Sequence, residues 1–116
     1  MDIPEPIQRE LELLGGIKGL KKSLPHNKKI VNLKNIIHAI SDQYRLKILL
    51  ILNKQPVCVC IIKDIIGISD SKLSYHLSTL RDNGLIYGKQ QGNWIIYYLT
   101  KKGNIITKFI NENLAI

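Results

Sequence analysis

Residues 57–80 read VCVCIIKDIIGISDSKLSYHLSTL, and their pattern predicts two short helices joined by a tight turn. We expect the first helix over residues 58–66, entered through a short extended stretch and ended by Gly67. Ser69 is well placed to cap a second helix that runs from residue 70 to about residue 82. The first helix opens on the only two cysteines of the chain. The stretch therefore has a chemically reactive end and a polar helical end.

The second predicted helix has two different faces. Leu73, Leu77 and Leu80 follow the i, i+4, i+7 spacing of an apolar stripe. At about 100° per residue the opposite face and its shoulders carry small polar groups and one ring: Ser71, Tyr75 and Ser78, with Lys72, Ser74 and Thr79 beside them. Short hydroxyls are thin enough to enter a DNA major groove and bond bases or phosphates there. The alternative is a solvated amphipathic helix that binds nothing.

A β-hairpin is predicted after this helix, with strands over residues 85–90 and 94–99 and a turn at residues 91–93. Two helices, a turn and a hairpin make a winged helix-turn-helix, a mainly α fold with a β-hairpin wing (α+β). We expect the hairpin tip to lie on the DNA backbone or in the minor groove. His76 lies near the core edge, where a packed or phosphate-touching histidine is expected. The predicted DNA-binding residues are Ser69, Ser71, Lys72, Ser74, Tyr75, His76, Ser78, Thr79, Lys89, Gln90, Gln91 and Asn93.

The rest of the chain supports this unit. The predicted order is a helix over residues 6–14, a basic connector at 15–29, helices over 31–40 and 43–52, and a last helix from Thr100 to about Asn113. This gives an N-terminal dimerisation arm (residues 1–30), a DNA-binding core (31–100) and a C-terminal dimerisation helix (101–116). Apolar stripes on both terminal helices suit pairing with a second copy.

Composition narrows the class of partner. The 116 residues fit one domain and carry a net charge of +8. Residues 15–54 hold nine Lys or Arg against one acid, Asp42, which favours nucleic acid as partner over simple solubility. No apolar run is long enough to span a bilayer, so we expect a cytoplasmic protein. No histidine is paired with a nucleophile, and no phosphate-binding glycine loop is present, so we expect no enzyme activity.

Five motifs together resemble the ArsR-type (ArsR/SmtB, arsenic repressor) family of transcriptional regulators. They are residues 37–49 (IHAISDQYRLKIL), 57–60 (VCVC), 73–77 (LSYHL), 80–86 (LRDNGLI) and 94–99 (WIIYYL). Their order and spacing cover most of residues 31–100. The resemblance implies a homodimeric winged helix, paired through its first and last helices. It also implies binding to an imperfect palindrome and repression until an inducer arrives.

Cys58 and Cys60 are the candidate inducer site. The positive end of a helix and nearby Lys63 favour thiolates, and two thiolates chelate thiophilic ions such as As(III), Sb(III), Cd, Zn or Cu(I). The arsenic-responsive proteins that the chain resembles add a third cysteine three residues after the second, where this chain has Lys63. A two-sulfur site suits an arsenical, including a methylated one, or a metal completed by solvent.

Three alternatives to this sensor remain open. The pair forms a thiol-disulfide redox switch, or the cysteines only pack and sense nothing. In the third alternative the winged helix is a protein-interaction module. No cofactor is required in any of these cases.

Overall fold

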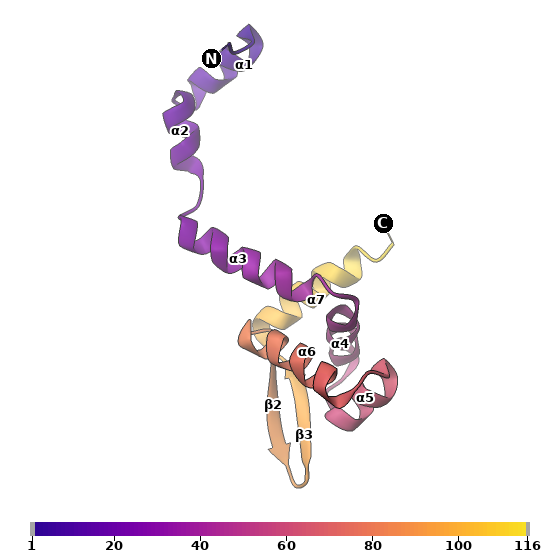
Figure 1. Ribbon diagram of the computed structural model, residues 1–116. Coiled ribbons are helices and arrows are strands. Elements are labelled where there is room, and N and C mark those ends of the chain that lie inside the picture. The colour runs from indigo at the N-terminus through magenta and orange to yellow at the C-terminus, as the bar shows by residue number, and fades with distance from the viewer. Residues whose placement is uncertain (1, 116) are drawn as a thin grey trace. The chain divides into compact units, whose positions relative to one another are not determined.

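The computed structural model describes residues 2–115, which form helices and one small antiparallel sheet (Figure 1). The elements are α1 (Glu5–Leu13), α2 (Gly16–Ser23), α3 (Asn27–Ile40), α4 (Gln43–Lys54), β1 (Val57–Cys58), α5 (Val59–Ile66), α6 (Asp70–Asp82), β2 (Ile86–Gln91), β3 (Trp94–Leu99) and α7 (Lys101–Glu112). The predicted mainly α fold with a β-hairpin wing is confirmed.

The chain divides into two compact units, residues 1–34 and 35–116. The first unit contains α1 and α2, and neither helix buries a side chain. The predicted basic connector at residues 15–29 is helical over most of its length, because α2 and the start of α3 occupy it. Two successive glycines with positive φ, Gly15 (85°) and Gly16 (75°), complete the turn between α1 and α2. Lys21 and Lys22 then lie in the last turn of α2, where positive charge is favourable.

The core of the second unit forms around α4. Asp42 caps this helix, accepting hydrogen bonds from the backbone N–H of Tyr44 (2.8 Å) and Arg45 (3.0 Å). The apolar side chains Ile48 and Leu49 are fully buried, as predicted for a central helix. The other fully buried large apolar side chains come from α5, α6 and the segment that enters β2, namely Ile62, Leu73, Leu80, Leu85 and Ile86. One core therefore holds the two helices of the predicted DNA-binding pair to α4.

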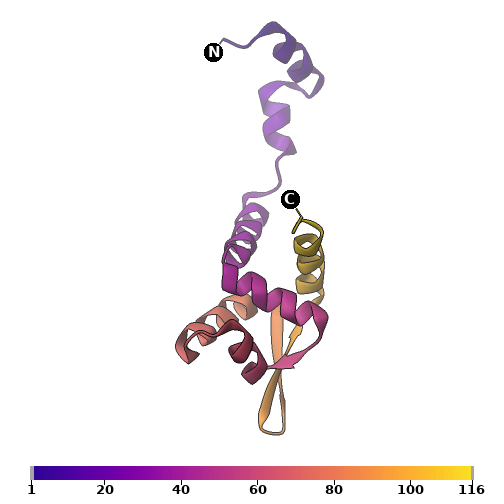
Figure 2. The same cartoon turned by 90° about the vertical axis from the view of Figure 1, so that its right-hand side faces the viewer.

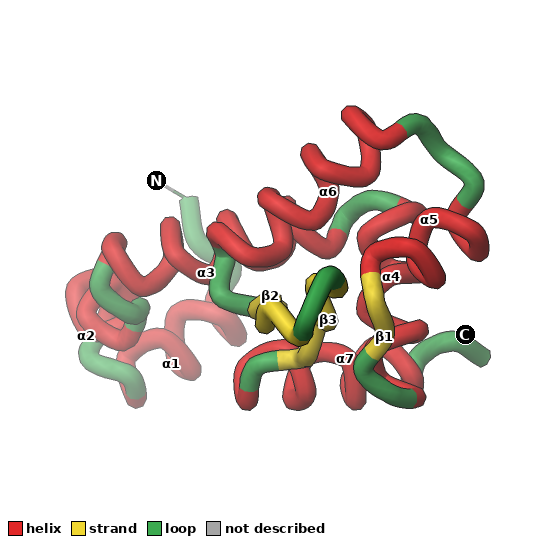
Figure 3. The backbone as a smooth tube through the Cα atoms, turned by 90° about the horizontal axis from the view of Figure 1, so that it is seen from below, coloured by secondary structure: helices red, strands yellow, loops and turns green. Residues whose placement is uncertain are grey.

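The turn between α5 and α6 is built as the sequence predicts. Gly67 ends α5 in the left-handed conformation (φ 71°), and its N–H bonds the carbonyl of Lys63 (2.8 Å). Ser69 caps α6 by accepting from the N–H of Lys72 (3.3 Å). An ion pair between Lys63 and Asp70 (2.5 Å) links the two helices across the turn. Figure 3 shows α5 and α6 joined by this loop, with the strands beside them.

The hairpin of β2 and β3 projects from the helices of the second unit (Figure 2). Its turn centres on Gly92 (φ 61°), and the register places Gln91 opposite Trp94. The predicted extended entry to α5 is confirmed as β1, which pairs antiparallel with β3 so that Cys58 lies opposite Ile96. The sheet therefore has three strands in the order β1-β3-β2. Strand β3 connects the cysteine segment directly to the wing.

The last helix, α7, packs against α4 and the sheet. Thr100 caps α7 by accepting from the N–H of Gly103 (2.9 Å), and its hydroxyl donates to the carbonyl of Gly84 (2.6 Å). Gly103 is buried so close to the carbonyl of Leu85 that a Cβ there would clash with it. Other apolar side chains on α7, including Ile105 and Phe109, remain exposed. In the part of the chain that is described, no helix is both long and apolar enough to cross a membrane.

Candidate nucleic-acid interface and thiol pair

Helix α6 has the two faces that its sequence predicts. Leu73, Leu77 and Leu80 are buried in the core. On the other side Tyr75 is 60% exposed, and Ser74 is also exposed. Ser71 and Lys72 are exposed near the start of the helix. The exposed face therefore offers hydroxyls, one aromatic ring and one positive charge to a ligand.

Several of the predicted contact residues already have partners within the protein. Ser69 caps α6, and its hydroxyl lies 3.3 Å from that of Ser71. Ser78 accepts from the guanidinium of Arg81 (3.2 Å), and the hydroxyl of Thr79 donates to the carbonyl of Tyr75 (3.0 Å). These bonds turn Ser78 and Thr79 toward their own helix. Ser74 and Tyr75 have the most freely presented polar groups of the exposed face.

His76 lies in the core instead of on the exposed face. It is only 8% exposed, and its ring packs against Tyr44 (centroids 5.6 Å apart) and Tyr75 (5.3 Å). Its Nδ1 lies 2.8 Å from Nη1 of Arg45. An arginine only donates hydrogen bonds, so Nδ1 accepts and a neutral ring carries its proton on Nε2. The structure thus favours the packed histidine over the phosphate-touching one.

Arg45 is a buried residue behind the candidate interface that the sequence alone did not single out. Its side chain is buried (5% exposed) and donates to the carbonyls of Ala39 (2.5 Å) and His38 (3.4 Å) as well as to His76. The guanidinium thereby joins the end of α3, helix α4 and helix α6. One signal was available, because Arg45 lies on the same i, i+3, i+4 stripe as the buried Ile48 and Leu49.

Burial and neighbouring charges set the protonation of this cluster. Burial lowers the pKa of His76 below its usual 6.5, Asp42 opposes that shift, and the charges of Arg45 and Lys72 add to it. Burial alone would raise the pKa of Asp42. However, the N–H groups of Arg45 and Tyr44 and the charges of His76 and Arg45 hold it below 3.8. At neutral pH the cluster therefore contains an ionised Asp42 and a neutral His76.

The wing presents one positive charge near its tip. Lys89 is exposed, and its Nζ lies 5.8 Å from the centroid of the Tyr98 ring. The side-chain amide of Gln91 donates to the hydroxyl of Tyr98 (2.9 Å), and that of Gln90 donates to the carbonyl of Gly92 (2.8 Å). These bonds order the tip. Asn93 is exposed in the turn itself.

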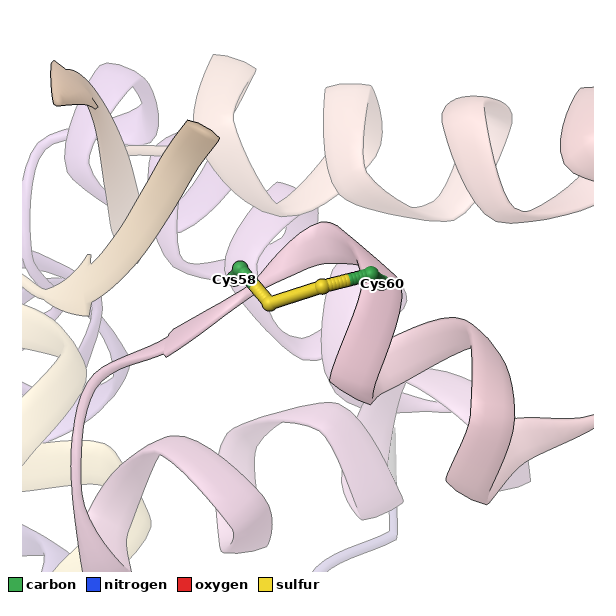
Figure 4. Close-up of a disulfide and its surroundings, with 2 residues drawn as sticks. All are labelled: Cys58 and Cys60. Atoms are coloured by element: carbon green, nitrogen blue, oxygen red, sulfur yellow. A yellow bond between two sulfur atoms is a disulfide. The ribbon is translucent and has the colours of Figure 1, made fainter. Parts of the chain in front are cut away.

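The two cysteines lie where β1 meets α5, and a disulfide joins them (Figure 4). Cys58 ends β1 and is the N-cap residue of α5, while Cys60 is exposed in the first turn of that helix. Their Cα atoms are 5.3 Å apart. Lys63, the residue at the expected third position, is paired with Asp70. Among residues 2–115 no three His, Cys, Asp or Glu side chains form a cluster suited to a metal ion.

A helix-turn-helix followed by a projecting β-hairpin defines the winged helix-turn-helix class of folds. A solved structure of this fold, HlyU from Vibrio cholerae N16961, superposes with a TM-score of 0.71 at 22% identity, covering 78% of this chain and all of HlyU.

Sequence comparison gives the family. A family model described as "Bacterial regulatory protein, arsR family" matches residues 42–87. The arsenical resistance operon repressor of Staphylococcus xylosus is 33% identical over 84 residues, which are 72% of this chain and 78% of the relative. The putative arsenical resistance operon repressor of Halobacterium salinarum is 31% identical over 66% of this chain and 60% of the relative's length. The chain belongs to the ArsR family, whose members are DNA-binding regulators and not enzymes.

The buried histidine makes the free energy of unfolding depend on pH. Because the pKa of His76 is lower in the folded than in the unfolded chain, the unfolded chain binds more protons as the pH falls below about 6.5. The stabilisation from neutral His76 is complete above that pH and is lost progressively as the pH falls through the lowered pKa. We expect urea unfolding between pH 7.5 and 5 to show this loss.

The matched variants are His76→Gln, which keeps an acceptor for Arg45 but does not titrate, and His38→Gln, which changes an exposed histidine. His76→Gln should flatten the pH dependence over this range, whereas His38→Gln should leave it unchanged. A wild-type slope that survives in His76→Gln contradicts the assignment.

Proposed function

We propose that this protein is a transcriptional repressor that binds an operator as a homodimer and leaves it when a thiophilic metalloid binds Cys58 and Cys60. The observation that carries the proposal is the direct link between the two sites. Cys58 ends β1, which pairs with β3 of the wing, and Cys60 lies in the first turn of α5, the helix that precedes α6. A ligand held by both sulfurs therefore acts on both DNA-facing elements.

The proposed DNA surface has two parts. Helix α6 inserts its exposed face into the major groove, with Ser74 and Tyr75 toward the bases and Ser71 and Lys72 toward phosphates. The wing tip, with Lys89 and Asn93, lies on the neighbouring backbone. Ser69, Ser78, Thr79, Gln90 and Gln91 support these elements through their internal bonds. In this proposal His76 does not contact DNA and instead supports α6 from the core through its contact with Arg45.

The proposed homodimer rests on the apolar side chains that the chain leaves uncovered. Ile105 and Phe109 on α7, and Leu114 just after it, are each 63–64% exposed. The first unit exposes Leu13 and Leu14 by 87% and 60%. Exposed apolar faces on helices near both ends of a small chain suit burial against a second copy. A two-fold dimer in turn suits a palindromic operator.

The sensor proposal rests on the relatives and on the chemistry of the pair. Proteins named as arsenical resistance repressors share a third or more of their matched residues with this chain. A two-electron reduction of the disulfide by a cellular dithiol would give two neighbouring thiols that can chelate one As(III) or Sb(III). A thiol-disulfide switch is the second candidate, because the sulfurs are bonded to each other in this structure.

Binding to DNA is tested by the salt dependence of affinity. A duplex selected from a random pool by the wild-type protein serves as operator, and a scrambled duplex serves as the non-specific site. Lys89→Ala should lower the slope of log affinity against log salt by about 1, because one phosphate contact is lost. Tyr75→Ala should weaken operator binding more than scrambled binding, because a base contact is lost.

Lys108→Ala removes an exposed charge from α7 and is the control, whose slope should match that of wild type. Equal losses on both duplexes for Tyr75→Ala would exclude a base contact. Failure of the wild-type protein to retain any duplex at low salt would exclude the DNA-binding proposal.

Release from DNA tests the sensor. The protein is reduced with a phosphine, freed of reductant, bound to the operator and titrated with arsenite, antimonite, Cd²⁺ or the thiol oxidant diamide. Release by arsenite or antimonite should occur in wild type and be lost in Cys58→Ser and Cys60→Ser, because each removes one of the two sulfur ligands. Release by diamide alone would establish the redox switch instead. Identical curves for all three proteins would show that the cysteines have no sensing role.

A further inference from the structure

An apolar cavity of about 390 Å³ opens directly beside the two cysteines. The sulfur-bearing residues form one side of it, and Gln55 and Pro56 form its edge. The remaining wall is apolar and comes from β1, α5 and β3, namely Val57, Ile61, Trp94 and Ile96. The proposed function uses the sulfurs but does not use this cavity. Trp94 is 57% and Ile61 43% exposed, so the cavity offers one ring and aliphatic groups to a ligand beside the two sulfurs.

The number of available ligands is a second, independent observation. Trivalent arsenic takes three ligands, and this sequence supplies two cysteines. Among the described residues no third His, Cys, Asp or Glu completes a cluster, and Lys63 is paired with Asp70. An arsenic atom that already carries one carbon substituent needs only two sulfurs. The ligand set therefore fits a monosubstituted arsenical better than inorganic arsenite.

We propose that the cavity binds the organic group of an aryl-substituted trivalent arsenical while Cys58 and Cys60 bind its arsenic atom. This inference rests on the proposed metalloid-sensing function and specifies its ligand class. An aromatic group packs well against the indole of Trp94 and the aliphatic side chains of Ile61 and Ile96. A cavity of about 150 Å³ is enough to hold benzene, so the space beside the sulfurs admits a phenyl ring.

The binding step is a ligand exchange that involves no redox change at arsenic. In phenylarsonous acid two As–O bonds break and two As–S bonds form, and each thiol proton leaves with a hydroxide as water. The disulfide must first be reduced by a dithiol, which supplies two electrons and two protons and becomes a disulfide itself. The 5.3 Å separation of the Cα atoms then leaves both thiols within reach of one arsenic atom.

Occupation of this cavity would act on the wing as well as on α5. Trp94 is the first residue of β3 and lies opposite Gln91 next to the wing turn. Ile96, also on the cavity wall, pairs with Cys58 across the sheet. A ring seated here touches the strand that carries the wing, whereas its arsenic atom touches the start of α5. The organic group therefore contacts the strand of the wing, in addition to the contact of the arsenic atom with the start of α5.

The single tryptophan of the chain makes the test direct, because its fluorescence reports on this cavity alone. Reduced, reductant-free protein is titrated with phenylarsonous acid and with methylarsonous acid. Both compounds have one As–C bond, so the ratio of their dissociation constants isolates the contribution of the organic group. A synthetic peptide of residues 57–66 gives the intrinsic ratio for the same two thiols, measured by competition with a coloured thiol reagent.

We expect the protein to prefer the phenyl over the methyl compound by at least about tenfold more than the peptide does, because the ring is removed from water. Ile61→Thr should remove most of this extra preference, because it replaces part of the apolar wall that covers the ring. Ile65→Thr changes an exposed isoleucine one turn further along α5, outside this cavity, and is the matched control. Trp94→Leu should likewise reduce the preference. Because this variant lacks the fluorescent residue, ligand binding to it is measured by the release of DNA.

The outcomes separate the two proposals. A phenyl-to-methyl ratio equal to that of the peptide, with both compounds binding and releasing DNA, overturns the cavity proposal and leaves the metalloid sensor in place. Failure of both compounds and of arsenite to bind overturns the sensor and the cavity proposal together. An unchanged ratio in Ile61→Thr and Trp94→Leu also overturns the assignment of this cavity.

Discussion

The buried guanidinium of Arg45 joins helix α4 to helix α6 and to the end of α3. It is covered by the core and donates to two carbonyls at the end of α3 and to the imidazole of His76 on α6. A buried charge with fewer hydrogen-bond partners would cost free energy, so all of these acceptors stabilise the buried guanidinium. Because the accepting nitrogen of His76 must be unprotonated, the burial of the arginine and the neutrality of the histidine depend on each other. The position of the exposed face of α6 follows from this contact.

In the proposed mechanism the sulfur pair acts on the opposite end of the same helix pair. Cys58 belongs to both β1 and the cap of α5, and β1 is hydrogen-bonded to the strand that leads out of the wing turn. The wing and α5, the helix that precedes α6, therefore meet at one short segment. In the proposed mechanism, a small ligand bound by the two sulfur atoms therefore influences a DNA-binding surface that is formed by separate elements. The apolar cavity opens at this segment and includes residues of both the wing and α5.

Local signals in the sequence predict most of the fold. Caps at Asp42, Ser69 and Thr100 and the left-handed glycines at 67 and 84 mark the ends of α4 to α7 closely. Helix α2 was missed because its glycines and lysines resemble a connector, although two positive-φ glycines, Gly15 and Gly16, form only a short turn between two helices. The contact between Arg45 and His76 joins residues 31 apart, and the cavity needs the register of β1 with β3. Neither arrangement is encoded in a local pattern, whereas the face of α6 is.

The most direct test of this account is a double-mutant cycle between Arg45 and His76. The free energy of unfolding in urea is measured at pH 7.5 for wild type, Arg45→Met, His76→Leu and the double variant, with Arg81→Met and Tyr97→Phe as a control pair whose contact is long (3.4 Å) and partly exposed. We predict a coupling energy of roughly 1–3 kcal/mol for Arg45 and His76 and a smaller one for the control pair. Additive losses at Arg45 and His76, within about 0.3 kcal/mol, would contradict the account.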